Sequence, residues 1–463
     1  MSWASRAPAA AGAAGAAPLP LRTKAGYAFG DHAINVQLAS ISLFFLFFLT
    51  EIAGLPPSLA GLVLLAGRWW DAITDPLMGR LSDVTTWKIG RRRPYFLIGA
   101  LPFGATTALL WATPSGDTGS FPYYVAIYLL NTTASTVLAV PYMSLLPELA
   151  LGYHERTSLN SFRAIGAGTA VLLTAVSLRP LVELLGGGPA GWERAGLVLG
   201  VWVTLPWLLV FLSTWERPGF RHGTQLDFLG GLRAALRHRA YRRLLALFLA
   251  ARIAVDVVGA MFLFYFTYWM GRPEDFPITI GLMLTAVLVS LPIWLQVAKR
   301  WDKRRVFLVG CGWWIAAQLL ILWMGPEQPR WLAFAVAAFA GVGYAVADLM
   351  PWSMLGDVID ADELHTGERR EGVYAGFFTF LRKLGGAAGV AGAGLVLELS
   401  GFVRGQPQSE TTLLAIRLLT GAAPIAFLAI AMAIALGYPI TRDRHAAISA
   451  QLLARRGAGD APA

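Results

Sequence analysis

The stretch GRWWDAITDPLMGRLSD, residues 67–83, places Asp71 and Asp75 near the end of a long apolar run. From about residue 34 to this point, only Glu51 and Arg68 interrupt the run. A carboxylate within hydrocarbon is costly, and residues four apart share one helix face, so two such groups repel each other. The stretch therefore predicts a membrane helix whose aspartates face a compensating cation in a bundle interior or cavity.

The composition supports a membrane protein. The 463 residues are 56% hydrophobic and only 14% charged, whereas about a quarter of the residues in a soluble domain are charged. The net charge of +10 comes from short basic clusters between apolar runs, which favours loops that orient a membrane protein over a nucleic-acid partner. The single cysteine, Cys311, and six scattered histidines predict neither a disulfide framework nor a metal cluster, and no cofactor beyond a coupling ion.

Runs of about 20 apolar residues are long enough to cross a bilayer as helices. The chain holds twelve of them, which predicts an all-α membrane protein with twelve transmembrane helices in two six-helix bundles. The predicted spans are 27–50, 56–79, 94–113, 121–146, 161–185, 194–214, 244–270, 277–298, 306–324, 331–355, 372–399 and 411–439.

Loop charge predicts the orientation, because Lys and Arg gather in cytoplasmic loops. Alternate loops carry the basic clusters, so both termini are predicted to be cytoplasmic in a multi-pass protein of the cell membrane. Residues 1–21 lack the strongly apolar core of a signal peptide, which favours a tail. The predicted regions are a disordered N-terminal tail at 1–25, six-helix bundles at 26–214 and 244–440, a central cytoplasmic loop at 215–243 and a C-terminal tail at 441–463.

The two halves carry a weak internal repeat. A basic loop follows the second span of each half, at 79–94 and 298–306, with Asp83 and Asp302 in comparable places. Related halves place substrate sites between them near the membrane midplane. Asp83 with Arg91 and Arg92 could form a cytoplasmic gate that holds one conformation closed, although such arginines also serve orientation and lipid binding.

Further oxygen-bearing groups lie next to the two aspartates along the chain. Thr74 lies between them, and Pro76 has no N–H, so the carbonyl of Ala72 loses its helical partner. Carboxylates, a hydroxyl and a carbonyl suit a hard cation such as Na⁺, or a shared proton. The alternative is that Asp75, roughly 7–8 Å from the cytoplasmic end of its span, is simply hydrated.

Further charges lie at comparable depths. Lys383 is roughly 16 Å into its span, where it needs a carboxylate or a substrate anion as partner, while Arg163 is close enough to the span end to snorkel. For the neighbouring Arg382, a structural role and a functional role are equally supported. In the second half, Asp256 and Asp348 either pair with Arg252 or contact the solute.

The paired-aspartate segment and PWSMLGDVIDADELHTGERREGVYAGFFTFLRKLGG, residues 351–386, together resemble the glycoside–pentoside–hexuronide:cation symporters of the major facilitator superfamily. The resemblance implies two six-helix bundles that expose a central cavity alternately to each side. It implies that Asp71 and Asp75, with Thr74 and Thr136 nearby, bind the coupling cation. By the same resemblance, Lys383 lies beside this site and Arg163 lines the cavity.

The sugar-binding positions depart from the family pattern. By the resemblance they are Asn35, Ala139 and Met143, so both carboxylates and the tryptophan that grip a galactoside elsewhere in the family are absent. Asp31 offers a carboxylate one turn from Asn35. This wall of the predicted cavity is therefore more apolar than in a galactoside carrier.

These features predict a monomeric secondary transporter that moves a sugar or glycoside together with Na⁺ or H⁺. Its predicted partners are a small-molecule solute, the coupling cation and the lipid bilayer, with no nucleic acid. A first alternative keeps the fold and carries a lysolipid or another amphiphile. A second is a membrane sensor without flux. A membrane enzyme is disfavoured because the sequence shows no nucleophile, metal cluster or cofactor motif.

Overall fold

The computed structural model describes residues 19–114, 120–150, 153–216, 236–367 and 371–459. The chain divides into two compact units, Met1–Gly223 and Thr224–Ala463. The predicted tail residues 1–18, most of the central loop and the last four residues lie outside the described ranges. Each unit is an all-helical bundle and is described by itself below.

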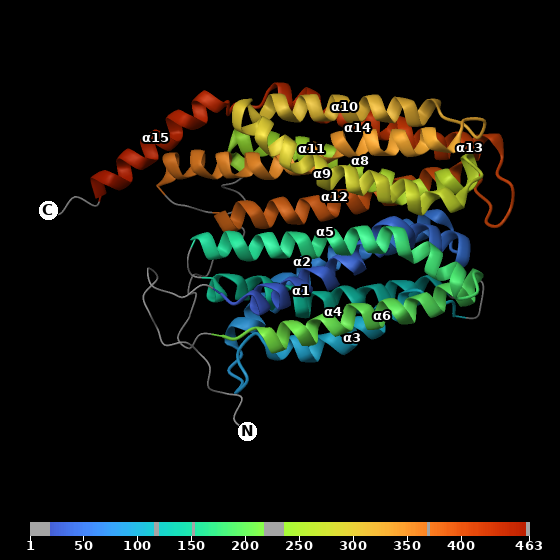
Figure 1. Cartoon of the computed structure of the whole chain (residues 1–463), viewed down its shortest axis with the longest axis horizontal. Coiled ribbons are helices and arrows are strands. Elements are labelled where there is room, and N and C mark those ends of the chain that lie inside the picture. The colour runs from blue at the N-terminus through green and yellow to red at the C-terminus, as the bar shows by residue number, and fades with distance from the viewer. Residues whose placement is uncertain (1–18, 115–119, 151–152, 217–235, 368–370, 460–463) are drawn as a thin grey trace. The chain divides into compact units, whose positions relative to one another are not determined.

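The first unit contains six long helices, of which the first continues through two π-helical turns (Figure 1). The elements are α1 (Leu21–Ser40), η1 (Ile41–Phe45), η2 (Phe48–Ile52), α2 (Pro57–Val84), α3 (Pro94–Leu110), α4 (Ser120–Leu149), α5 (Tyr153–Leu184) and α6 (Gly188–Ser213). Helix α1 packs against α5 and α6, α2 packs against α4, and α3 packs against both α4 and α6.

The second unit repeats this plan and adds a terminal helix. The elements are α8 (Arg239–Phe264), η3 (Tyr265–Trp269), η4 (Pro273–Asp275), α9 (Phe276–Arg300), α10 (Lys303–Trp323), α11 (Arg330–Thr366), α12 (Glu371–Leu399), α13 (Glu410–Arg417), η5 (Leu418–Ala422), α14 (Ala423–Leu436) and α15 (Arg442–Gly459). Helix α11 packs mainly against α9 and α10, whereas α8 packs against α12 and α14.

The twelve predicted spans all correspond to helices in the described residues. Nine of these helices are long and apolar enough to cross a membrane by length and composition alone. The other three are α1, α2 and α3. Helix α3 has only 17 residues, and α2 carries the charges around Asp71, which lower its hydropathy. All three belong to the first unit, and two of them, α1 and α2, carry charged residues within their helices.

Several predicted boundaries need correction. Helix α1 begins at Leu21, so the tail predicted at 1–25 extends too far; Lys24, inside the helix, pairs with Glu155 of α5 at 3.2 Å. Helix α8 begins at Arg239, within the predicted central loop, because His238 caps its first turn. The predicted C-terminal tail contains α15, an amphipathic helix, since Ile448 and Leu452, four residues apart, are both buried.

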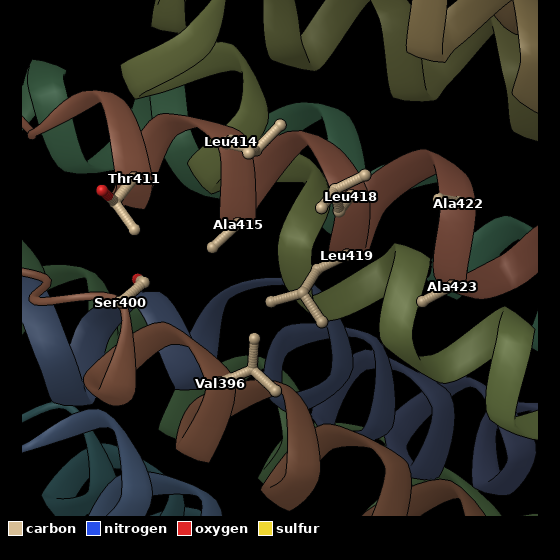
Figure 2. Close-up of a pocket in the computed structure, with 9 residues that line it drawn as sticks. All are labelled: Val396, Ser400, Thr411, Leu414, Ala415, Leu418, Leu419, Ala422 and Ala423. Atoms are coloured by element: carbon tan, nitrogen blue, oxygen red, sulfur yellow. The ribbon is translucent and has the colours of Figure 1, made fainter.

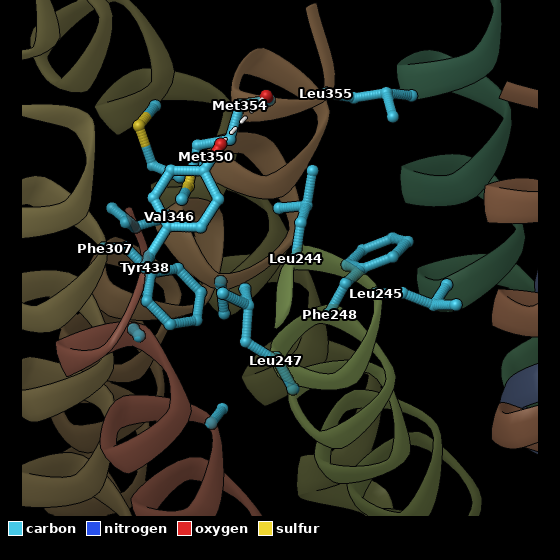
Figure 3. Packing of buried hydrophobic residues seen from close by; sticks show 14 of the residues in the cluster. Leu244, Leu245, Leu247, Phe248, Phe307, Val346, Met350, Met354, Leu355 and Tyr438 are labelled. Carbon is cyan, nitrogen blue, oxygen red and sulfur yellow. Dashed lines mark hydrogen bonds between the residues drawn. The ribbon is translucent and has the colours of Figure 1, made fainter. Parts of the chain in front are cut away.

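A hydrophobic core holds the second unit together (Figure 3). Leu244, Leu247 and Phe248 of α8 lie in the same cluster as Phe307 of α10, and Tyr438, beyond α14, closes it. The Tyr438 hydroxyl donates to the carbonyl of Met354 at 3.4 Å, which satisfies its polar end inside the core. The inner faces of these helices are thus fixed by apolar packing, and polar groups on the remaining faces need a separate explanation.

Small residues let α3 and α6 approach closely in the first unit. A Cβ atom at Gly200 would lie 2.6 Å from the carbonyl oxygen of Gly104, and a Cβ at Gly104 would lie 2.5 Å from that of Gly200. Backbone atoms cannot yield to such contacts, so both positions require glycine. Close packing of this kind is how membrane helices associate without a hydrophobic driving force.

A charged network joins helix ends in the first unit, at the end that carries the loop 85–93, here called the basic end. Glu148 of α4 is only 2% exposed and accepts hydrogen bonds from Arg91 and Arg92, both at 2.5 Å. Arg92 also contacts Asp83 at 3.2 Å. Glu216, just beyond α6, accepts the backbone N–H groups of Arg91, Arg92 and Arg93, each at 2.8 Å, and so caps α3.

The second unit has a comparable network at the corresponding end of α10. Lys303, which follows α9, contacts Asp357 of α11 at 2.6 Å, while Asp302 caps α10 by accepting from the N–H of Arg304. His445 of α15 lies 3.1 Å from Asp360, which ties the terminal helix to α11. In each unit, a basic residue following the second helix therefore meets an acidic residue of the fourth.

The close approach of α3 and α6 generates a prediction about stability. Gly200→Val should lower the melting temperature of the detergent-solubilised protein by several degrees or prevent folding, because the added carbons meet backbone atoms. The matched control is Gly312→Val, since a Cβ at Gly312 meets nothing within 4 Å. Thermal unfolding followed by fluorescence-detected size-exclusion chromatography measures both; equal melting temperatures would contradict the packing described here.

The buried acid of the basic end generates a second prediction. Glu148→Ala should destabilise the protein by about 3–5 kcal/mol, because removing one partner of a buried ion pair strands the other charges. Glu183→Ala is the control, since Glu183 is 56% exposed in its pair with Arg179 and such pairs contribute about 1 kcal/mol or less. Denaturant titration in micelles compares the two. A midpoint for Glu148→Ala as high as that of the control would show that Glu148 has no structural role.

Candidate functional site

The two aspartates of α2 lie at the contact between α2 and α4. Asp71 is buried and Asp75 half-buried. The hydroxyl of Thr136 on α4 donates to Asp75 at 2.8 Å, and the Thr74 hydroxyl lies 3.4 Å from that of Thr136. The structure therefore brings three of the four predicted cation-binding residues into one chain of contacts, with Asp71 one turn away on the same face.

An arginine on the same helix provides part of the compensating charge. Arg68 Nη1 lies 3.3 Å from Asp71 Oδ2, an i,i+3 pair. In the sequence Arg68 interrupts the apolar run, and its spacing of three residues from Asp71 is the local signal that predicts this pair. Arg68 therefore lies on the face of α2 that carries the two aspartates.

The donor set at Asp75 fits a hard cation. Two carboxylates and two hydroxyls offer only oxygen atoms, the ligands that Na⁺ and similar ions prefer. Among the described residues, no group of three or more His, Cys, Asp or Glu side chains has the arrangement of a metal cluster. Residues Asp71, Thr74, Asp75 and Thr136 are thus suited to a monovalent ion or a proton, and their role in binding stays a prediction.

A second polar group joins α1, α4 and α5. Both Nε and Nη2 of Arg163 donate to the carboxylate of Asp31, the latter at 3.2 Å. The Tyr142 hydroxyl donates to Asp31 Oδ2 at 2.7 Å, and the Arg163 guanidinium lies over the Tyr142 ring, 5.5 Å from its centroid. Arg163 is therefore held by Asp31 instead of snorkelling to a span end. Tyr142 has no place among the predicted site residues, because nothing local in the sequence links it to Asp31.

The remaining predicted cavity residues have modest contacts. Met143 is exposed, and its sulfur lies 2.9 Å from Arg163 Nη2, so it belongs to the same group. Asn35 donates to the backbone carbonyl of Asp31 at 2.8 Å, which engages its amide within α1, and Ala139 is half-buried on α4. Lys383 lies on α12 of the second unit, so its pairing with the aspartates of α2 stays a prediction.

Two carboxylates of the second unit, Asp256 and Asp348, lie beside one arginine. Arg252 of α8 binds Asp256 through two hydrogen bonds, at 3.0 and 2.6 Å, and reaches Asp348 of α11 at 3.2 Å. Both aspartates therefore pair with the same arginine. The predicted gate residues Asp83, Arg91 and Arg92 all lie in the network at the basic end, together with Glu148 and Glu216, which sequence reasoning missed because they are distant in the chain.

An apolar groove lies along the second unit between α12 and the segment from α13 to α14 (Figure 2). Its volume is about 470 Å³. Ser400 and Thr411 carry hydroxyls at one end, and the other lining residues are apolar: Val396, Leu414, Ala415, Leu418, Leu419, Ala422 and Ala423. Its chemistry suits a hydrocarbon chain and not a sugar.

Comparisons with known proteins agree on one family. The family described as MFS/sugar transport protein matches residues 26–442. The chain is similar to an uncharacterized symporter of Synechocystis sp., with 32% identity covering 95% of this chain and 97% of the relative. It is also similar to the sodium-dependent lysophosphatidylcholine symporter 1-A of Danio rerio, with 26% identity covering 92% and 87%.

Two further likenesses concern one sequence relative and the fold. The isoprimeverose transporter of Lactiplantibacillus pentosus is 28% identical, covering 86% of this chain and 85% of the relative. In structure, the chain resembles a bacterial homolog of the human lysosomal transporter Spinster, with a TM-score of 0.66, 12% identity and coverage of 90% and 95%. The chain therefore belongs to the MFS/sugar transport protein family, and it is a multi-pass membrane transporter of the symporter type, not an enzyme.

Proposed function

We propose that the chain is a symporter that moves a sugar or glycoside across the cell membrane with Na⁺ or H⁺, with both termini in the cytoplasm. The observation that carries the coupling is the oxygen-lined contact of Asp75, Thr74 and Thr136, with Asp71 buried one turn away. A site rich in carboxylate and hydroxyl oxygens within a membrane bundle suits a cation, and a cation that enters from one side can drive a solute along with it.

The coupling follows from charge. A cation bound between the carboxylates neutralises them and releases groups that would otherwise pair with them, with Lys383 as the candidate in the second unit. If this change favours the conformation that binds solute, then solute tightens cation binding by the same factor. Alternating access requires that closure occur with both sites filled or both empty. The isoprimeverose transporter among the relatives supports a glycoside as the solute.

A lysolipid is the second candidate solute. The apolar groove along α12 and α13 suits a hydrocarbon chain. The Danio rerio relative is named as a sodium-dependent lysophosphatidylcholine symporter. At the predicted cavity positions, Ala139 and Met143 are also less polar than the side chains that bind sugar hydroxyls. A panel of radiolabelled glycosides and lysophosphatidylcholine, tested in proteoliposomes with Na⁺, Li⁺ and pH gradients, separates the candidates: accumulation of lysolipid alone would replace the glycoside proposal.

The cation site generates a prediction for Asp71→Asn. The variant should lose gradient-driven uptake at least tenfold, because one of the two charges that hold the cation is gone. Asp443→Asn is the control, since Asp443 is an exposed residue of α15. Uptake into proteoliposomes with and without an imposed cation gradient measures both. Uptake by Asp71→Asn that still responds fully to the gradient would exclude Asp71 from coupling.

A separate prediction concerns Thr136→Val. It should raise the cation concentration for half-maximal uptake about tenfold, equivalent to about 1.4 kcal/mol, by removing one oxygen ligand and the hydrogen bond to Asp75. Thr169→Val is the matched control, because the Thr169 hydroxyl bonds only to backbone carbonyls of its own helix. Cation titrations of initial uptake rates decide the matter. Equal half-saturation concentrations in the two variants would place the cation elsewhere.

A further inference from the structure

Three helices of the second unit present matching stripes of side chains, spaced four residues apart. Such spacing puts the members of each stripe on one helix face. The stripes are Phe248, Arg252 and Asp256 on α8; Tyr344, Asp348 and Trp352 on α11; and Phe378, Arg382 and Gly386 on α12. Helix α11 is antiparallel to α8 and α12. The last residue of its stripe therefore meets the first residues of the other two stripes, and the three stripes form three layers.

The first layer is aromatic. The Phe248 and Phe378 rings stack with centroids 4.2 Å apart, and Trp352 meets both edge-on, at 5.9 and 5.0 Å. These contacts fix the Trp352 ring against α8 and α12. The indole nevertheless remains 39% exposed. A tryptophan that served only as a lipid-interface anchor would turn away from the neighbouring helices, whereas this one lies on the face where they meet.

The second layer is charged. Asp256 already engages Arg252 through two hydrogen bonds, so Asp348 is not needed to satisfy the guanidinium. Asp348 has a side chain 43% exposed, and in the described part of the chain only its Oδ1 has a hydrogen-bond partner. A carboxylate held in place by an arginine, with its second oxygen exposed, is preorganised to accept hydrogen bonds.

The third layer closes the cluster behind Asp348. A Cβ atom at Gly386 would lie 1.8 Å from Asp256 Oδ2, so α12 passes Asp256 as closely as glycine permits. Arg252 lies between Asp256 and Asp348, and Arg382 occupies the same layer on α12. The formal charges of these four side chains cancel, so the cluster has no net charge that would select a charged solute over a neutral one.

We propose that Asp348 and Trp352 bind the sugar ring of the transported solute. Asp348 Oδ2 accepts hydrogen bonds from ring hydroxyls, and the exposed indole packs against the C–H face of the ring. Asp348 and Trp352 lie four residues apart, so both contact one bound ring from the same side. Binding sites for small molecules combine aromatic surface with a few placed polar groups in this way. This assignment rests on the proposed glycoside transport, and it identifies the residues of the second unit that bind the solute.

The test uses full-length protein in proteoliposomes and the methyl glycosides of xylose, glucose and galactose as probes. Trp352→Leu should raise the half-saturation concentration of the transported glycoside at least tenfold, and Trp352→Phe about threefold. The control is Trp331→Leu, because Trp331 lies on the same helix and is 65% exposed at its other end; it should change the value less than twofold. The conservative Trp352→Phe variant keeps the test valid if Trp352→Leu fails to fold.

Monodeoxy glycosides test Asp348 independently of stability. Removing the hydroxyl that Asp348 binds should weaken transport by the wild type at least tenfold, while Asp348→Asn should be weak toward the parent glycoside and show less than a threefold further effect. A residue with only a structural role would weaken all analogues by the same factor, and that result, or wild-type behaviour of both variants, overturns the inference while leaving glycoside transport in place.

Two other outcomes separate this inference from the function on which it rests. If the wild type transports none of the glycosides, the proposed function fails first and the inference fails with it. If phosphocholine or lysophosphatidylcholine, and not a glycoside, competes at this surface in a manner sensitive to Trp352→Leu, then the exposed face binds a quaternary ammonium and the sugar-ring assignment is overturned.

Discussion

The cost of charge within hydrocarbon is the constraint on which the rest of this structure depends. Each carboxylate in a membrane helix must meet a cation, a hydrogen-bond donor or water, and three aspartates of the first unit have such partners. Asp31 meets Arg163 and Tyr142, Asp71 meets Arg68, and Asp75 meets Thr136. Where the partner lies on another helix, as for Asp31 and Asp75, the two helices are joined by polar contacts as well as by packing.

The two units pair the charged residues within their helices in partly different ways. In each, a basic residue after the second helix meets an acid of the fourth: Arg91 and Arg92 meet Glu148, and Lys303 meets Asp357. Nearer the centre of the helices they diverge. The first unit carries hydroxyls and carboxylates that suit a cation, while the second carries a balanced cluster around Arg252 with an exposed indole beside it. This division of labour is consistent with one half binding the ion and the other contributing to solute recognition.

The apolar features of the second unit are compatible with both candidate solutes. The groove beside α13 has an apolar lining, and the relatives include proteins named for lysophosphatidylcholine and for isoprimeverose. Aromatic and charged layers on α8, α11 and α12 give the second unit a surface that a sugar ring can use. The proposed cation site is compatible with either solute, because its carboxylate and hydroxyl oxygens suit an ion whichever solute is carried with it.

The sequence by itself determined the twelve spans, the basic loops and the placement of Asp71 and Asp75 on one helix face, because hydropathy and the 3.6-residue period are local properties. It could not supply the partners. Thr136 follows Asp75 by 61 residues, Glu148 follows Arg91 by 57 and Asp31 precedes Arg163 by 132. Local period fixes which face a side chain occupies, but only packing decides which helix lies opposite. For that reason the tertiary structure alone decided that Arg163 is held by Asp31, that Arg252 serves two aspartates, and that Glu148 organises the basic end.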